Sequence, residues 1–341
     1  MRFVVAKPQT RMSFGDLFYS LPDDLAINDE FDKIIEECNS KANSELNHQI
    51  RERLKKEVEV IKETDNQSAI CIIKAITDYS HELGYPVTLF GAEAGTVIMY
   101  LIGASNVHPN QIEYSDFSSE FFISNLYKKE GSFTLAITEP VRTKLQSILN
   151  DKFGQIKSSN EIYKRIYLPN YNSLEQVKKL SDLTGVNCFE QQYFDAINSL
   201  YIDIYKDMFG EEPNLEKAVS VNELNKLYAY NMCSHNHEKS IRYFNELSSY
   251  LFSDDFYKAF MDSDIYSENA IFLSYRGIWE SDKAGYIKYL EKNNVSPNCL
   301  FCFKELTNIW SKATCMSRIN VMLALKWYEI NFPEEYEKIV K

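Results

Sequence analysis

The segment Gly84–Asn110, GYPVTLFGAEAGTVIMYLIGASNVHPN, constrains the fold more than any other part of the chain. A short β-like run leads into a turn in which Gly91 and Gly95 flank Glu93, and an apolar helical pattern follows Thr96. A strand, a glycine turn and a helix in this order are typical of phosphate-binding loops. The segment therefore raises the question of whether this chain binds phosphate.

The same segment contains the longest apolar run, Val87–Ala104, which is 18 residues long. Because an ionisable residue inside a membrane span is costly, the glutamate in this run favours a buried helix and no membrane contact. The seven cysteines are scattered and odd in number, and the first ten residues contain too short an apolar run for a signal peptide. We therefore expect reduced thiols and a cytoplasmic location.

The charge of the chain is acidic overall and unevenly distributed. The net charge is −12 over 341 residues, whereas Leu126–Leu180 contains ten basic and five acidic residues. Phosphate neutralisation supplies most of the affinity of nucleic-acid binders, so the acidic total argues against a dedicated one. Solvated charged side chains are the simplest interpretation of the basic segment. The alternative is a DNA-facing surface made of Lys128, Lys129, Arg142, Lys144, Lys152, Lys164 and Arg165.

Apolar periodicity predicts a chain that is mostly helical. The expected helices include one or two exposed amphipathic helices over 31–62, a stronger helix over 66–83, one from Pro140 to near Gly154, and one from an N-cap at Ser173 to Thr184, ended by Gly185. The expected strands are Tyr85–Phe90, Ser132–Thr138 and Ile162–Leu168. No strand pattern follows Asn187, so we predict a mixed domain at 1–187 and a helical domain at 188–341.

The sequence GYPVTLFGAEAGTV and the later VHP resemble, without a gap, the palm loop of C-family bacterial replicative DNA polymerases. In the PolC type of DNA polymerase III α subunit this loop reads G-Y-L-V-G-S-R-G-S-x-G-S-S and precedes an apolar helix. Gly91 falls on a loop glycine, Thr96 on the last serine and Phe90 on the arginine.

Further segments resemble the same family in the same order. They are QIRERLKKEVEVI before the loop, GSFTLAITEP, YKRIYLPNYNSLEQVKKLSDLTGVN, SVNELNKLYAYNMCS, FLSYRGI and the segment that ends in CMSRINVMLALKWYEINFP. The resemblance implies an α+β, mostly helical fold. It would consist of a small palm-like sheet of the polymerase-beta-like nucleotidyltransferase type, followed by an all-α fingers-like domain.

The resemblance also implies that the catalytic acids have been lost. The family's D-x-D aspartates fall on Ser132 and Thr134, and its third aspartate falls on Tyr167. Two-metal phosphoryl transfer needs carboxylates on adjacent strands to hold Mg²⁺, and hydroxyl and phenol groups are poor substitutes. We therefore expect no cofactor, since Mg²⁺ would be required only by a functional polymerase site.

The nucleotide-binding residues that remain under this resemblance are Gly91, Gly95, Thr96 and Lys312. The histidine of the family's K-A-H motif falls on Thr314. Glu93 is one carboxylate and makes no metal pair, so we interpret it as a residue at a helix N-terminus, favoured by the macrodipole. The lone motif Cys299–Cys302 and the pair His235 and His237 lack the further ligands that zinc requires, which favours core cysteines and a polar loop.

Three functions follow from this reading. The first is a catalytically inactive interaction module or decoy that binds replication proteins. The second is a weak DNA or nucleotide binder that uses the basic palm face. The third is an active nucleotidyltransferase with a metal site that the sequence does not reveal. The acidic total favours the first, so we expect a protein partner, at most weak DNA binding and no enzymatic activity.

Overall fold

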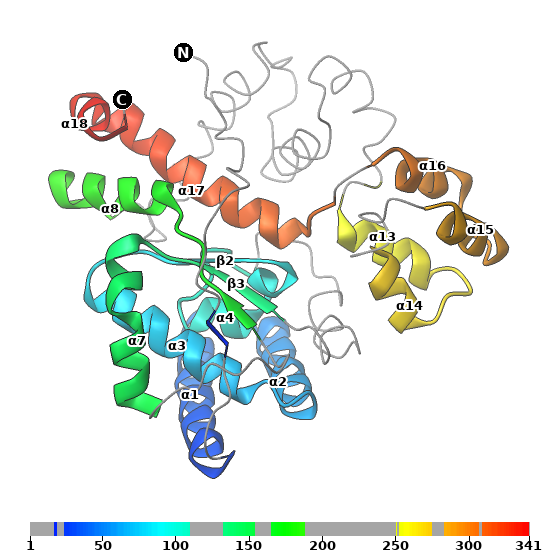
Figure 1. Cartoon of the computed structure of the whole chain (residues 1–341), viewed down its shortest axis with the longest axis horizontal. Coiled ribbons are helices and arrows are strands. Elements are labelled where there is room, and N and C mark those ends of the chain that lie inside the picture. Colours follow the sequence, from blue (N-terminus) through cyan, green and yellow to red (C-terminus); the bar gives the residue numbers. More distant parts are fainter. Residues whose placement is uncertain are drawn as a thin grey trace.

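The computed structural model describes residues 17–18, 24–109, 132–153, 165–187, 250, 252–274, 283–306 and 309–340. In these ranges the chain is mostly helical and contains one small sheet, which agrees with the predicted helix-rich α+β class (Figure 1). None of the helices in these ranges is long and apolar enough to span a membrane.

The sheet has four strands within the described part of the chain, in the order β1-β4-β3-β2. Their bounds are β1 Leu17–Phe18, β2 Thr88–Phe90, β3 Ser132–Ala136 and β4 Arg165–Tyr167. Strand β3 pairs in parallel with β4 and antiparallel with β2, and β1 pairs antiparallel with β4. The prediction that the segments of β3 and β4 are neighbouring strands is confirmed. Strands β2 and β3 are shorter than expected, and β4 ends at Tyr167, one residue before the predicted end.

One face of the sheet is covered by the first helices of the chain and by α7 (Figure 1). Leu89, Phe133 and Leu135 point into this layer and are fully buried. The helices are α1 Asp24–Glu45, α2 His48–Glu63, α3 Gln67–Glu82, α4 Val97–Leu101 and α7 Glu139–Phe153. The two amphipathic helices expected over 31–62 are present as α1 and α2: one face of each is buried, including Phe31 and Ile61, and the other is exposed.

The opposite face of the sheet is covered by α8 Asn172–Thr184 and α17 Lys312–Asn331, and α18 Pro333–Val340 packs against these two helices. Side chains alternate along a strand, so the residues flanking Leu89 and Leu135 point to this side. Phe90 and Ala136 pack here against Val321 and Tyr328 of α17 and Leu174 of α8. A helix close to the C-terminus therefore completes the core above the sheet (Figure 1).

Helix α8 ends as predicted and begins differently. Gly185 adopts a left-handed conformation with φ +71° and stops the helix. The N-cap is Tyr171 and the helix starts at Asn172, so the prediction of Ser173 as N-cap was wrong. Tyr171 donates its backbone N–H to Ile137 O at 3.1 Å, which extends the sheet and fixes where the helix can start.

Helix α17 is the long helix expected near the C-terminus. Ser311 caps it, and its Oγ accepts the N–H of Thr314 at 3.1 Å. Pro333 lies one residue beyond the short break at Phe332, where it begins α18. The apolar positions expected inside are Ile319, Leu323 and Leu325, which are buried, and Met322 and Trp327, which are half-buried.

The remaining helices surround an aromatic cluster of Phe256, Phe260 and Phe303, whose ring centroids lie 5.9 Å apart. They are α13 Ser253–Met261, α14 Ser267–Phe272, α15 Ala284–Lys292 and α16 Pro297–Glu305. The proposed domain boundary near residue 187 stays a prediction. Residues 188–249, which follow it, lie outside the described part of the chain.

Candidate functional site

The loop after β2 is a tight turn without a free helix N-terminus. Gly91 has a φ of +114°, which favours glycine, and residues Ala92–Gly95 form a 3₁₀ helix, η1. The Thr96 hydroxyl donates to Glu93 O at 2.8 Å and so closes the turn before α4 begins. The apolar helix predicted here is short, because α4 ends at Leu101.

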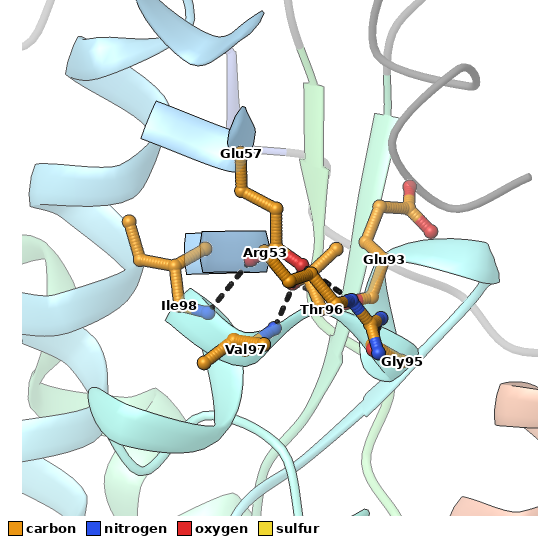
Figure 2. Close-up of polar contacts among 7 residues, drawn as sticks. All are labelled: Arg53, Glu57, Glu93, Gly95, Thr96, Val97 and Ile98. Atoms are coloured by element: carbon orange, nitrogen blue, oxygen red, sulfur yellow. Dashed lines mark hydrogen bonds and ion pairs between the residues drawn. The ribbon is translucent and has the colours of Figure 1, made fainter. Parts of the chain in front are cut away.

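A buried carboxylate from α2 occupies the start of α4. Glu57 is 1% exposed, and its two carboxylate oxygens accept the N–H groups of Val97 and Ile98 at 3.0 Å each (Figure 2). The first N–H groups of a helix lack partners within the helix and attract anions. Here an internal anion already satisfies two of them.

Arg53 holds this carboxylate in place. Its Nε donates to Glu57 Oε1 at 3.1 Å, and its Nη2 donates to Gly95 O in the loop (Figure 2). Burial raises the pKa of the Glu57 carboxyl, while the Arg53 guanidinium and the two backbone N–H groups act in the opposite direction. The pair therefore ties α2, η1 and α4 into one rigid unit.

Helix α17 satisfies the donor at the front of the loop. Gly91 N–H donates to Thr314 Oγ1 at 2.8 Å, and Thr314 Oγ1 also lies 2.8 Å from Ser311 Oγ. Thr314 is the position on which the family histidine falls. A loop N–H that would be available to a phosphate oxygen is thus bonded to the helix that covers it.

Glu93 lies in η1, and its carboxyl group points away from the Arg53–Glu57 pair (Figure 2). Its side chain is 2% exposed, and Oε2 has no hydrogen-bond partner in the described part of the chain. Burial raises its pKa to about 8. Glu93 lies in the first turn of a helix, as interpreted, but this helix is the short η1, and the N-terminus of α4 binds Glu57 instead.

Gly91 also leaves the space that this carboxyl group fills. A Cβ added at Gly91 would lie 2.0 Å from Glu93 Oε2. The loop therefore needs glycine at this position both for its positive φ and for the close approach of Glu93.

The three positions matched to catalytic aspartates converge on adjacent strands. Thr134 is the register partner of Tyr167 on β4 and of Phe90 on β2, and Ser132 is the partner of Arg165. Directly opposite residues on neighbouring strands lie about 4.5–5.5 Å apart. The three matched positions therefore lie on neighbouring strands, and the residue types there are hydroxyls and a phenol.

The guanidinium group of Arg318, on α17, lies over Phe90, the β2 partner of Thr134. Arg318 Cζ lies 4.3 Å from the ring centroid of Phe90 and 4.5 Å from that of Trp310. Tyr171 meets Phe90 edge to face at 5.4 Å, and Arg318 Cζ lies 5.9 Å from the Tyr171 centroid. The aromatic box holds a cation on the sheet face that carries Phe90.

This donor set does not fit a pair of Mg²⁺ ions. Divalent cations of this kind prefer carboxylate oxygens, and a nearby guanidinium repels them. Across the described ranges, no group of three or more His, Cys, Asp or Glu side chains could hold a metal ion. Burial raises the pKa of the Cys299 thiol to about 12 and that of Cys302 to about 11, which agrees with their interpretation as core residues. His235 and His237 lie outside the described residues.

Lys312, the predicted nucleotide-binding lysine, is bound to acidic neighbours. Its Nζ lies 3.0 Å from Asp255 Oδ1, and its backbone N–H donates to Asp254 Oδ2 at 2.9 Å. Both members of the Lys312–Asp255 pair are about one-fifth exposed. A phosphate group would have to compete with Asp255 for the lysine.

The structure describes four of the seven residues of the predicted basic surface. Arg142, Lys144 and Lys152 lie on α7, on the sheet side opposite α17, and Lys152 Nζ pairs with Glu30 at 2.9 Å. Arg165 is in β4. Lys128, Lys129 and Lys164 lie outside the described residues.

Sequence reasoning missed Arg53, Glu57 and Arg318. The first two had a detectable signal, because an arginine and a glutamate four residues apart lie on one face of a helix. Nothing in the local sequence showed that this face would be buried. Arg318 had no signal, since only the packing of α17 over β2 brings it to Phe90.

Comparison with known proteins places these features in a family. A family model described as the bacterial DNA polymerase III alpha NTPase domain matches residues 29–241. The chain belongs to this family. A search for similar curated proteins found no match.

The range of the chain that matches the bacterial DNA polymerase III alpha NTPase domain begins in α1. It contains the loop at Gly91–Thr96, β3, β4 and α8. The coarse resemblance inferred from the sequence is therefore confirmed. Helices α13 to α18, including the helix that carries Arg318 and Lys312, lie beyond the matched range.

Proposed function

We propose that this member of the DNA polymerase III alpha family is catalytically inactive and serves as a protein-interaction module or decoy for the replication machinery. The observation that carries the proposal is the packing of α17 onto the sheet face at Phe90, with Arg318 held over that ring. In this reading residues 1–187 are a palm-like domain, and 188–341 are a fingers-like domain of the C-family type.

The chemistry of the site supports inactivity. Ser132, Thr134 and Tyr167 offer no carboxylate to a metal ion, and the guanidinium of Arg318 repels one. The Thr88 and Ser317 hydroxyls form a hydrogen bond between β2 and α17, which keeps the helix on the sheet. Helix α17 buries Phe90 and Ala136 on this face, which restricts the room for a primer terminus.

The charge of the chain supports a protein partner over DNA. The net charge is −12. Two features further reduce the positive charge available to DNA on the proposed palm face: Lys152 is paired with Glu30, and α7 lies on the other side of the sheet. A protein can lose its catalytic activity and keep its fold, because catalysis depends on a few residues whereas the fold depends on the whole core. Such a protein can still bind a partner. Weak DNA or nucleotide binding is the alternative outcome of the experiments below.

The purified protein is expected to show no primer extension with Mg²⁺ or Mn²⁺. The triple variant Ser132→Asp, Thr134→Asp, Tyr167→Asp should also be inactive, because Arg318 and Phe90 remain in place. When titrated into a reconstituted bacterial DNA polymerase III reaction on a primed template, the protein should reduce synthesis in a dose-dependent way. Nucleotide incorporation is measured on a gel.

The cause of inhibition separates the two binding functions. If extra polymerase subunits restore synthesis and extra template does not, the interaction module is supported. If extra template restores synthesis, and raising the salt concentration also relieves inhibition, the protein binds DNA instead. Template-dependent extension by the protein alone would contradict the proposed inactivity. Absence of any inhibition would contradict the proposed role as a decoy.

Deoxynucleoside triphosphates are expected to bind no better than about millimolar, near −4 kcal/mol. Lys312 is the one lysine retained at the proposed nucleotide site, and Asp255 already neutralises it. Isothermal titration with each triphosphate, with and without Mg²⁺, measures this affinity. A micromolar, Mg²⁺-dependent affinity abolished in Lys312→Ala and retained in Lys304→Ala, a control on exposed α16 surface, would contradict the prediction.

A further inference from the structure

A cavity of about 610 Å³ lies between the C-terminal ends of α3 and α4 and the side of α8. Its volume falls within the range of about 300–1,000 Å³ that small-molecule sites occupy. The loop Gly91–Thr96 does not line it, so the cavity is separate from the site described above.

Two lysines that line this cavity are more deeply buried than their acidic partners, of which Asp78 also lines the cavity. The side chains of Lys74 and Lys178 are 14% and 17% exposed. Lys74 Nζ pairs with Asp78 at 2.6 Å, and Lys178 pairs with Asp182, but these carboxylate groups belong to side chains that are 43% and 62% exposed. A phosphate in the cavity would compete with Asp78 and Asp182 for these lysines, and both carboxylates are exposed enough to be hydrated when they are displaced.

A third lysine in the wall has a structural role. Lys41 Nζ donates to Leu101 O at 3.1 Å, at the end of α4. This bond offsets the partial negative charge of the helix C-terminus, which would otherwise oppose an anion. The basic side chains left to bind a ligand are Lys74, Lys178 and the imidazole of His81, which also lines the cavity.

Two glycines give the basic side chains their positions. Gly84 and Gly103 both have positive φ values, +73° and +77°. A Cβ added at Gly84 would lie 2.9 Å from Lys178 Cε, and one at Gly103 would lie 2.9 Å from His81 Cε1. The absence of a side chain at both glycines thus leaves room for Lys178 and His81 to lie against the backbone.

Aromatic rings form the rest of the wall. Lys178 Nζ lies 5.6 Å from the ring centroid of Tyr85, and Tyr100 meets His108 edge to face at 4.9 Å. Rings beside ammonium groups suit a ligand that combines an anionic group with an organic moiety.

We propose that this cavity binds a small phosphate monoester, with the phosphate at Lys74 and Lys178 and the organic part against Tyr85 and Tyr100. A phosphate carries nearly two negative charges and three acceptor oxygens, so one group can accept hydrogen bonds from both lysines and from His81. The proposal is independent of the proposed function, because neither catalysis nor a protein partner enters it.

Isothermal titration of the full chain with AMP, inorganic phosphate and adenosine tests the proposal. AMP is expected to bind with a dissociation constant of about 0.1–1 mM, phosphate more weakly, and adenosine not measurably. Lys178→Gln and Lys74→Gln should each weaken AMP binding by about tenfold, because each removes a charged donor. The matched control is Lys179→Gln, the next residue on α8, whose side chain is 55% exposed and pairs with Glu175.

Thermal unfolding of each variant, measured without ligand, confirms that the compared proteins are folded. If one lysine variant unfolds, the other provides the comparison. Binding of AMP that both lysine variants leave unchanged, equal binding of adenosine, or no binding of AMP up to about 10 mM would each overturn the proposal.

Discussion

Replacing Arg53 with methionine is expected to lower the free energy of unfolding by about 3–5 kcal/mol. The variant leaves Glu57 buried without its counter-charge, while Val97 and Ile98 still require its oxygens. It also removes the donor to Gly95 O, so the loop loses its anchor to α2. Urea denaturation followed by circular dichroism measures the change.

Lys55→Met is the matched control on the same helix. Lys55 pairs with Glu52 at 2.7 Å, but both side chains are more than half exposed, so its loss should cost less than about 1 kcal/mol. The double variant Arg53→Met, Glu57→Leu should not recover wild-type stability, because two backbone N–H groups would then be buried without acceptors. Equal effects of Arg53→Met and Lys55→Met would show that the buried pair has no special role.

Glu93→Gln is expected to stabilise the protein at pH 8 and to have little effect near pH 4. The folded state holds the Glu93 proton up to about pH 8, whereas the unfolded chain releases it near the ordinary value of 4.5. Between these values the unfolded state binds fewer protons, so the wild type loses stability as pH rises. The full difference corresponds to an upper limit of about 5 kcal/mol.

The measurement is the difference in unfolding free energy between variant and wild type at several pH values from 4 to 8.5. Because glutamine does not titrate, this difference should grow steadily over that window. Glu82→Gln, at an exposed position on α3, serves as the control and should change stability by no more than about 0.5 kcal/mol at any pH. A flat difference for Glu93→Gln would mean that Glu93 is ionised in the folded protein.

The sequence predicted features whose signal is local. Alternation identified β3 and β4, and the resemblance placed them side by side, because three matched positions had to converge. Gly185 marked the end of α8 because glycine adopts the left-handed conformation easily. These inferences needed only a few neighbouring residues.

Features that depend on distant contacts were missed. Strand β1 has two residues, too few to show alternation, and exists because β4 pairs with it. The start of α8 was misplaced because Tyr171 is bound to Ile137 of the sheet. The sequence also does not reveal that Glu57, from a different helix, binds the N-terminus of α4.

The hydrogen bond between Thr88 and Ser317 joins residues 229 positions apart. During synthesis on the ribosome, β2 and the loop emerge long before α17 exists to cover them. Until then Phe90 and Ala136, which α17 later covers, are exposed to water or bound by another protein. Contacts between residues so far apart also form slowly. The packing of α17 therefore delays completion of this part of the core until α17 itself has been synthesised.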